Sequence, residues 1–287
     1  MKVFVTGATG FTGSHVVALL LKNGYQVRCL YRPTSDHSAL LHQPELEWTL
    51  GDVADTVRLS ASMQGMDALV NLVSLGFGHA DSIVRAAQTA GVRRAVFVST
   101  TAIFTQLNAE SKAIRLRAEH TIETSGLRYT ILRPTMIYGT SHDRNMWRLI
   151  RFMRYSRIVP IFGDGKSLQQ PIHVDDVAQA VLSCLKSDST IGKSYNIAGK
   201  HPLTYNQVID TIAAKINKRV RKLHMPFPPV VAMMKFFERL HIHLPVKAEQ
   251  VLRLNENKNF SYEDAEKDFG FHPLSFEEGI RMEFETG

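Results

Sequence analysis

Apolar runs and amphipathic stretches alternate along the first 155 residues of the chain. The runs are rich in Val, Ile and Leu, as in strands that are buried on both faces of a parallel sheet. The stretches between them repeat apolar residues at helical spacing. Strands are predicted at 2–6, 26–31, 46–50, 68–73, 94–99 and 128–133. Helices are predicted at 12–23, 55–63, 79–90, 111–125 and 144–155. This alternation predicts an α/β fold with a doubly wound parallel sheet.

The first apolar run ends in a glycine-rich turn that opens into the first helix. Gly7 permits the tight turn, Gly10 lets the backbone approach a pyrophosphate, and Gly13 lets the helix pack closely on the strand. The start of the helix offers free N–H groups and a partial positive charge to the anion. Because a strand precedes these glycines and a helix follows them, they predict a Rossmann domain that binds a dinucleotide.

The pattern changes near residue 157. Later strands are predicted at 158–162 and 193–198, and later helices at about 174–186 and 204–217, followed by two apolar helices and a terminal helix near 275–285. We expect a Rossmann domain over residues 1–157 and a smaller C-terminal substrate lobe over residues 158–287 that closes over the ligand. The strand at 193–198 is expected to return to the main sheet.

The net charge indicates the class of ligand, and the cysteines indicate the compartment. The formal net charge of +7 suits an anionic ligand such as a phosphorylated cofactor. The basic cluster from Lys215 to Lys222 is expected at a helix C-terminus and an edge strand, so nucleic-acid binding is not expected. Cys29 and Cys184 stand in apolar surroundings, which indicates reduced thiols in a cytoplasmic protein. Because a strand is predicted to start at residue 2, we expect no signal peptide. No apolar run reaches the roughly 18 residues of a membrane span.

The histidines do not predict a metal site. The pair His37 and His42 and the pair His241 and His243 come without the Cys or carboxylate ligands that would complete one. His173 is expected to be a core or hinge histidine.

Short motifs extend over nearly the whole chain. They are Thr6–Gly13, Leu50–Val53, Val96–Ala102, Ser125–Pro134 with Ile137–Gly139, Pro171–Ala178 and Ser194–Gly199. In this order they resemble the motifs of the extended, or atypical, short-chain dehydrogenase/reductase superfamily, whose members include NAD(P)-dependent epimerases and dehydratases. The resemblance implies a cofactor site and a catalytic hydroxyl. The implied cofactor residues are Gly7, Thr9, Gly10, Phe11, Thr12, Gly13, Asp52, Val53, Val73 and Pro134, and the hydroxyl is that of Thr101.

The end of the second strand bears on the type of nicotinamide cofactor. An acid at that place binds the ribose 2′-hydroxyl of NAD, whereas this chain has Arg32 and no acid before Asp36. A guanidinium can bind a 2′-phosphate in bidentate fashion, which favours NADP over NAD. The alternative is that Arg32 is a solvated residue at a strand end. Asp52 either bonds the adenine amino group, as in the family, or serves as a turn residue or a cap for the helix near Asp55.

The family's acid/base pair is incomplete in this chain. The resemblance implies a Tyr four residues before a Lys on one helix, where the ammonium lowers the phenol pKa. If Lys112 is the family lysine, Asn108 stands at the tyrosine position; in the other register the pair is Ser111 and Arg115. Lys112 either holds the nicotinamide ribose or is a solvated charge. Thr101 either positions a substrate oxygen or satisfies backbone at a strand end.

The substrate side differs from that of the sugar-nucleotide members. These members often present an Arg where this chain has Gln169-Gln170-Pro171. The difference argues against a sugar nucleotide as the substrate. The four arginines at positions 148, 151, 154 and 157 form a basic stripe that faces either a cleft or solvent. The apolar stretch 230–240 is expected to be a core helix of the small lobe, with a substrate pocket, a partner or a membrane surface as alternatives.

Two functions follow from these residues. The first is an NADP-dependent reductase, epimerase or dehydratase that acts on a small carbonyl or alcohol, with Thr101 and Lys112 at the reaction centre. The alternative is a non-catalytic NADP-binding regulatory or assembly protein that has lost the tyrosine and associates with a protein partner or as a homodimer.

Overall fold

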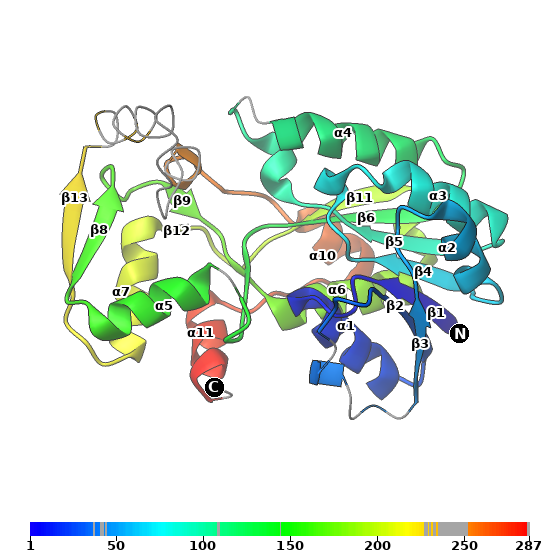
Figure 1. Cartoon of the computed structure of the whole chain (residues 1–287). Helices are drawn as coiled ribbons and strands as arrows, with labels where there is room; N and C mark the ends of the chain where they lie inside the picture. The colour runs from blue at the N-terminus through cyan, green and yellow to red at the C-terminus, as the bar shows by residue number, and fades with distance from the viewer. Residues whose placement is uncertain are drawn as a thin grey trace.

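A seven-stranded sheet forms the larger part of the computed structural model, in the right half of Figure 1. The structure describes residues 1–287 except 37, 41–42, 44, 108–109, 144, 227–228, 230, 232–233, 235–251 and 286–287. In spatial order the strands are β11 (Lys193–Ile197), β6 (Arg128–Pro134), β5 (Arg94–Val98), β4 (Ala68–Asn71), β1 (Lys2–Thr6), β2 (Gln26–Tyr31) and β3 (Leu46–Leu50). All neighbouring pairs are parallel. The strand order reverses between β1 and β4, where folds of this class bind ligands at the carboxyl ends of the strands.

Helices cover both faces of this sheet, which confirms the doubly wound α/β fold (Figure 1). Helices α1 (Phe11–Lys22) and α6 (Val174–Lys186) pack on one face. Helices α2 (Thr56–Met63), α3 (Ala80–Thr89) and α4 (Glu110–Glu123) pack on the other. Each layer has its own apolar core, so burial of the sheet on both sides explains the continuous apolar runs of the sequence.

The remaining elements form a second group beside the carboxyl ends of the strands of this sheet. Its two-stranded sheets are β7 (Ile137–Tyr138) with β10 (Ile172–His173), β9 (Leu168–Gln169) with β12 (Leu203–Thr204), and β8 (Ile158–Phe162) with β13 (Arg221–Met225). Its helices are α5 (Met146–Tyr155), α7 (Tyr205–Lys215) and α11 (Phe276–Glu285), which share a third core. Helix α10 (Glu263–Phe269) packs instead against β11 of the main sheet.

The observed elements agree with the predicted ranges to within about two residues. The strand expected at 193–198 pairs with β6 in the main sheet. The Lys215–Lys222 cluster spans the end of α7 and the start of β13. No prediction was made for α10 or for the two-residue strands β7, β9, β10 and β12. The one-turn helices η1 (Ser38–Leu40), η2 (Leu75–Phe77), η3 (Thr101–Phe104) and η4 (Asp188–Thr190) were not predicted either. Most of the apolar stretch 230–240, together with His37, His42, His241 and His243, lies outside the described residues.

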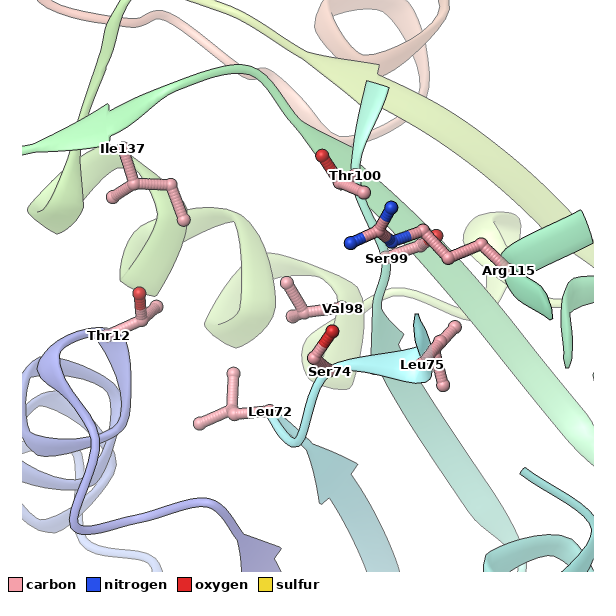
Figure 2. Close-up of a pocket in the computed structure, with 9 residues that line it drawn as sticks. All are labelled: Thr12, Leu72, Ser74, Leu75, Val98, Ser99, Thr100, Arg115 and Ile137. Carbon is pink, nitrogen blue, oxygen red and sulfur yellow. The ribbon is translucent and has the colours of Figure 1, made fainter. Parts of the chain in front are cut away.

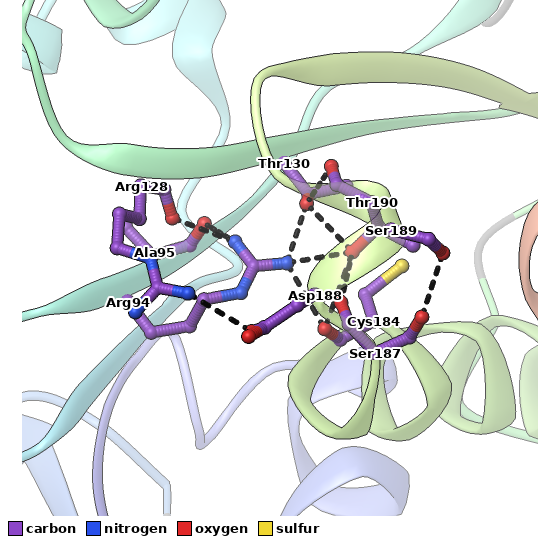
Figure 3. A network of polar contacts seen from close by, with 9 residues as sticks. All are labelled: Arg94, Ala95, Arg128, Thr130, Cys184, Ser187, Asp188, Ser189 and Thr190. Carbon is purple, nitrogen blue, oxygen red and sulfur yellow. Dashed lines mark hydrogen bonds and ion pairs between the residues drawn. The ribbon is translucent and has the colours of Figure 1, made fainter.

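A buried arginine at the amino end of strand β5 contacts helix α6 (Figure 3). Arg94 opens β5, and its guanidinium donates to five acceptors. These are the carbonyl oxygens of Ala95, Arg128 and Cys184 and the hydroxyls of Thr130 and Thr190, at 2.5–3.0 Å. No carboxylate accepts from it among the described residues, and burial lowers the pKa of Arg94. Backbone and threonine oxygens therefore hold this charge in the interior.

Candidate functional site

The glycine turn leaves an open cradle at the start of α1. Gly7 has φ +75°, and a Cβ atom there would lie 2.9 Å from the Leu72 carbonyl carbon. A Cβ on Gly13 would overlap the Gly7 carbonyl oxygen, so the close contact of helix and strand requires glycine. Gly10 is the N-cap of α1 and contributes no side chain to cover the first amides of the helix. Thr9 and Phe11 are half-buried beside it. Exposed helix amides beside a compact turn suit a pyrophosphate.

A cavity of about 220 Å³ lies next to this cradle, at the carboxyl ends of the central strands (Figure 2). Its polar lining comes from Thr12 of α1, Ser74, Ser99 and Thr100 after β4 and β5, and Arg115 of α4. Leu72, Leu75, Val98 and Ile137 provide the apolar lining. The cavity therefore combines hydroxyl groups and one cation with apolar walls at the place where a doubly wound sheet binds its ligand.

Arg115 is the cation of this cavity. Its Nη1 donates to Ser111 Oγ, one helical turn earlier, at 3.0 Å. The guanidinium lies over Gly76 of η2, where a Cβ atom would come within 3.1–3.2 Å of it. Lys112 does not line the cavity, because its Nζ donates to the Thr105 carbonyl oxygen at 2.6 Å. The register with Ser111 and Arg115 is therefore the one that faces the cavity, and Asn108 of the other register lies outside the described residues.

A buried carboxylate fixes α4 against the sheet. Glu119 is 3 % exposed and accepts hydrogen bonds from the Ser99 hydroxyl and from two nitrogens of Arg133 on β6. In this ion pair, Arg133 Nη2 lies 2.7 Å from Glu119 Oε2. Because Glu119 follows Arg115 by four residues, the ion pair also sets the rotation of α4 that turns Arg115 toward the cavity. Glu119 was not among the predicted site residues, and its only signal in the sequence is an acid between the apolar positions Ala118 and Ile122.

The predicted catalytic hydroxyl lies behind the cavity wall. Thr101 is 6 % exposed, and its Oγ1 donates to the Pro134 carbonyl oxygen at 3.3 Å. Its neighbour Thr100 lines the cavity instead. This hydrogen bond joins the ends of β5 and β6. It corresponds to the second of the two alternatives given for Thr101, in which the hydroxyl bonds to backbone at a strand end.

The predicted adenine and ribose positions surround the ends of β2 and β3. Arg32 is exposed directly after β2, and its backbone N–H donates to Ser35 Oγ at 3.1 Å. Asp52 accepts from the Ala54 N–H at 2.9 Å, which makes it a turn residue, and Asp55 caps α2. Val53 is buried, and Val73 is half-buried against the same core. Arg32 and the Asp52 turn are therefore available to a ligand that extends away from the glycine cradle.

Gln169 and Gln170, on the substrate side, make their hydrogen bonds to backbone groups of the chain itself. Gln170 donates to the Gly199 carbonyl oxygen at 2.7 Å and accepts from the Phe260 N–H at 2.9 Å. Gln169 donates to the Leu254 carbonyl oxygen at 3.1 Å. Both side chains are buried and anchor the segment 254–260.

Neither the arginine stripe nor His173 belongs to the cavity lining. Arg154 stacks over Trp147 and Phe284 at 5.1 and 5.2 Å. His173 is buried, caps α6 by accepting from the Asp175 N–H, and has its pKa lowered by burial. Within the described part of the chain, no cluster of His, Cys, Asp or Glu has the composition of a metal site.

A family model described as NAD(P)H-binding matches residues 7–188. The chain is 27% identical to the NADH dehydrogenase [ubiquinone] 1 alpha subcomplex subunit 9 of Arabidopsis thaliana, with 88% of this chain and 67% of that protein covered. It is 26% identical to the 2-alkyl-3-oxoalkanoate reductase of Stenotrophomonas maltophilia, with 98% of both chains covered. These two relatives are named for different activities.

Solved structures share the fold. The crystal structure of gox2253 superposes with a TM-score of 0.81 at 20% identity, covering 99% of this chain and 97% of that one. The UDP-glucuronic acid 4-epimerase of Bacillus cereus, solved with UDP-glucuronic acid and NAD, superposes with a TM-score of 0.78 at 20% identity, covering 99% and 98%. Among the described helices of this chain, none has the length and apolar character needed to cross a membrane.

Proposed function

We propose that this chain, which belongs to the NAD(P)H-binding family and to the extended short-chain dehydrogenase/reductase superfamily, uses NADP in the oxidation or reduction of a small carbonyl or alcohol. The observation that carries the proposal is the cavity in which Arg115, Ser99 and Thr100 converge beside the glycine cradle. A nicotinamide bound there supplies or accepts a hydride.

The chain's own residues fit such a cofactor along the carboxyl edge. The turn from Gly7 to Gly13 and the first amides of α1 would hold the pyrophosphate. Arg32, which is exposed after β2, would bind the ribose 2′-phosphate, and the turn around Asp52 and Val53 would bind the adenine. The half-buried Val73 and the buried Pro134 complete the predicted cofactor set.

Arg115 replaces the missing phenol in a different chemical role. A guanidinium stays charged at every working pH, so it stabilises negative charge on a substrate oxygen rather than exchanging a proton. The Ser99 and Thr100 hydroxyls orient that oxygen, and Thr101 supports them through Pro134. Water or a group on the substrate then supplies the proton, since a serine hydroxyl such as that of Ser111 is far less acidic than a phenol. The predicted contact of Lys112 with the nicotinamide ribose requires its Nζ to leave the Thr105 carbonyl.

Cofactor choice and turnover are tested separately. Fluorescence titration with NADPH and NADH should show tighter binding of NADPH, and Arg32→Glu should reverse that order; Arg58→Glu, which changes an exposed arginine on α2, should leave it unchanged. A panel of small ketones, aldehydes and alcohols then reports NADPH consumption. Tight binding without turnover of any substrate would contradict the enzymatic part of the proposal.

A non-catalytic binding role is the second candidate. Two observations favour it: no phenol lines the cavity among the described residues, and the chain resembles a protein named as a subunit of NADH dehydrogenase. It predicts a protein partner, or a second copy of the chain, whose association depends on bound NADP. A pull-down that Gly10→Trp leaves unchanged would contradict it. For either role, the buried thiols of Cys29 and Cys184 favour a reducing compartment such as the cytoplasm.

A further inference from the structure

The two-stranded sheet formed by β8 and β13 turns an apolar face to solvent (Figure 1, left edge). Alternate side chains of a strand point to opposite faces, and Val159 and Ile161 are buried on the inner one. The outer face, here named the basic apolar face, consists of Ile158, Pro160, Phe162, Arg221, Leu223 and Met225. Ile158 is 52 % exposed and Leu223 53 %. Exposed apolar side chains that gather on one sheet face are typical of an interaction surface.

Cations surround the amino ends of both strands. Arg157 precedes Ile158 and Arg219 precedes β13, and both are exposed. Lys218 lies against the end of α5, where its Nζ donates to the Arg154 carbonyl oxygen at 2.6 Å. Tyr155, the last residue of α5, is 86 % exposed. An exposed aromatic residue and several cations therefore border the basic apolar face.

No acidic residue balances these charges within the segments that build the face. Residues 145–163 contain four arginines and residues 211–226 contain five Lys or Arg, without an Asp or Glu in either segment. Lys222 pairs with Asp210 at 2.7 Å, but its neighbour in register is the buried Val159, so that acid lies on the inner side of the sheet. The uncompensated charge at the amino ends of the two strands is therefore positive, whereas the exposed Asp164 lies beyond their carboxyl ends.

The geometry points to the basic apolar face as a docking surface for an anionic phospholipid membrane. Apolar side chains enter the boundary between headgroups and acyl chains, while Arg and Lys reach the phosphates and Tyr155 lies among the headgroups. A second copy of the chain is less well matched, because two faces with the same positive charge repel each other. The surface lies away from the cofactor cavity, so it does not depend on the function proposed above.

Vesicle co-sedimentation of the full chain tests this docking. The chain should sediment with phosphatidylcholine–phosphatidylglycerol vesicles at low salt, but not with phosphatidylcholine alone, and high salt should release it. Each of Arg219→Glu and Arg221→Glu should weaken binding by about fivefold or more. The double variant Ile158→Ser, Leu223→Ser should weaken it by about tenfold. The matched control is Leu116→Ser, Arg117→Glu, an exposed leucine and arginine on α4, which should bind like the unchanged chain.

Three results would overturn the docking proposal. One is failure of the unchanged chain to bind anionic vesicles at low salt. Another is an equal loss of binding in the α4 control. The third is a dimer in light scattering that Leu223→Ser dissolves, which would make the face an interface between copies. NADPH titration and thermal unfolding of each variant distinguish lost docking from lost folding, because these side chains are exposed and remote from the cradle.

Discussion

Two arginines at opposite ends of the strands of the main sheet have opposite roles. At the amino edge, Arg94 is 7 % exposed and donates to five oxygens of the protein itself (Figure 3). At the carboxyl edge, Arg115 is held by Ser111 and faces a cavity whose other polar groups are hydroxyls (Figure 2). The same side chain is structural where the fold surrounds it with acceptors, and available to a ligand where the fold leaves a space. Three predictions test this contrast, and a fourth concerns the buried acid Glu283.

The largest effect is expected from Arg94→Met. The apolar side chain keeps much of the arginine volume, but it removes the guanidinium donors that reach the carbonyl oxygens of Arg128 and Cys184 and the hydroxyls of Thr130 and Thr190. We expect a loss of about 3–5 kcal/mol in the free energy of unfolding, measured by urea denaturation. NADPH affinity of the folded fraction should stay unchanged. A loss below about 1 kcal/mol would show that the network contributes little.

Arg115→Met should lower turnover and not stability. NADPH consumption with a small carbonyl substrate should fall by about 10- to 100-fold, the range expected when a charged substrate oxygen loses a hydrogen-bond donor. Urea denaturation should change little, because the guanidinium faces the cavity. The control is Arg117→Met, which alters an exposed arginine of the same helix. If Arg115→Met instead destabilises the chain and leaves turnover of the folded fraction unchanged, then the assignment of Arg115 to the substrate oxygen is wrong.

Glu283 of α11 is a buried acid in the second group of elements. It is 1 % exposed, and neither carboxylate oxygen has a hydrogen-bond partner among the described residues. Burial, and then the neighbouring charge of Asp143, raise its pKa from 4.5 to about 8. The folded chain therefore holds a proton that the unfolded chain releases between these values, so stability should fall as pH rises across that window.

Glu283→Gln should remove this pH dependence. The amide cannot ionise, so the variant should be more stable by about 1–2 kcal/mol at the upper end of the window, with little difference near pH 4.5. Thermal unfolding from acid to mildly alkaline pH measures the effect. Glu277→Gln, at an acid in the first turn of the same helix, is the control. Parallel pH profiles for the unchanged chain and Glu283→Gln would contradict the prediction.

The smallest effect is expected from Arg128→Ala. Its side chain is 53% exposed and pairs with Asp188 at 3.0 Å, while its carbonyl oxygen still accepts from Arg94. An exposed ion pair contributes about 0–1 kcal/mol, so urea denaturation should differ little from the unchanged chain. A loss as large as that of Arg94→Met would mean that the network depends on the surface ion pair rather than on the buried guanidinium.

Much of the fold could be predicted from the order of apolar runs and glycines. Strands buried on both faces must be apolar throughout, and Gly7 and Gly13 occupy positions where a Cβ atom would collide with backbone. These are local requirements, so they are visible in the sequence. Arg94 gave no such signal, because its acceptors come from β6, α6 and η4, far away along the chain.

The sequence by itself determined that a cradle for a dinucleotide stands at the carboxyl edge of a parallel sheet and that no tyrosine occupies either candidate position of the acid/base pair. Only the tertiary structure decided which register of α4 meets the cavity. Successive side chains on a helix point about 100° apart, so Ser111 and Lys112 cannot share one direction. The ion pair of Glu119 with Arg133 sets the rotation of α4, turning Arg115 toward the cavity while Lys112 bonds the Thr105 carbonyl. That choice depends on contacts between α4 and β6, which no local pattern encodes.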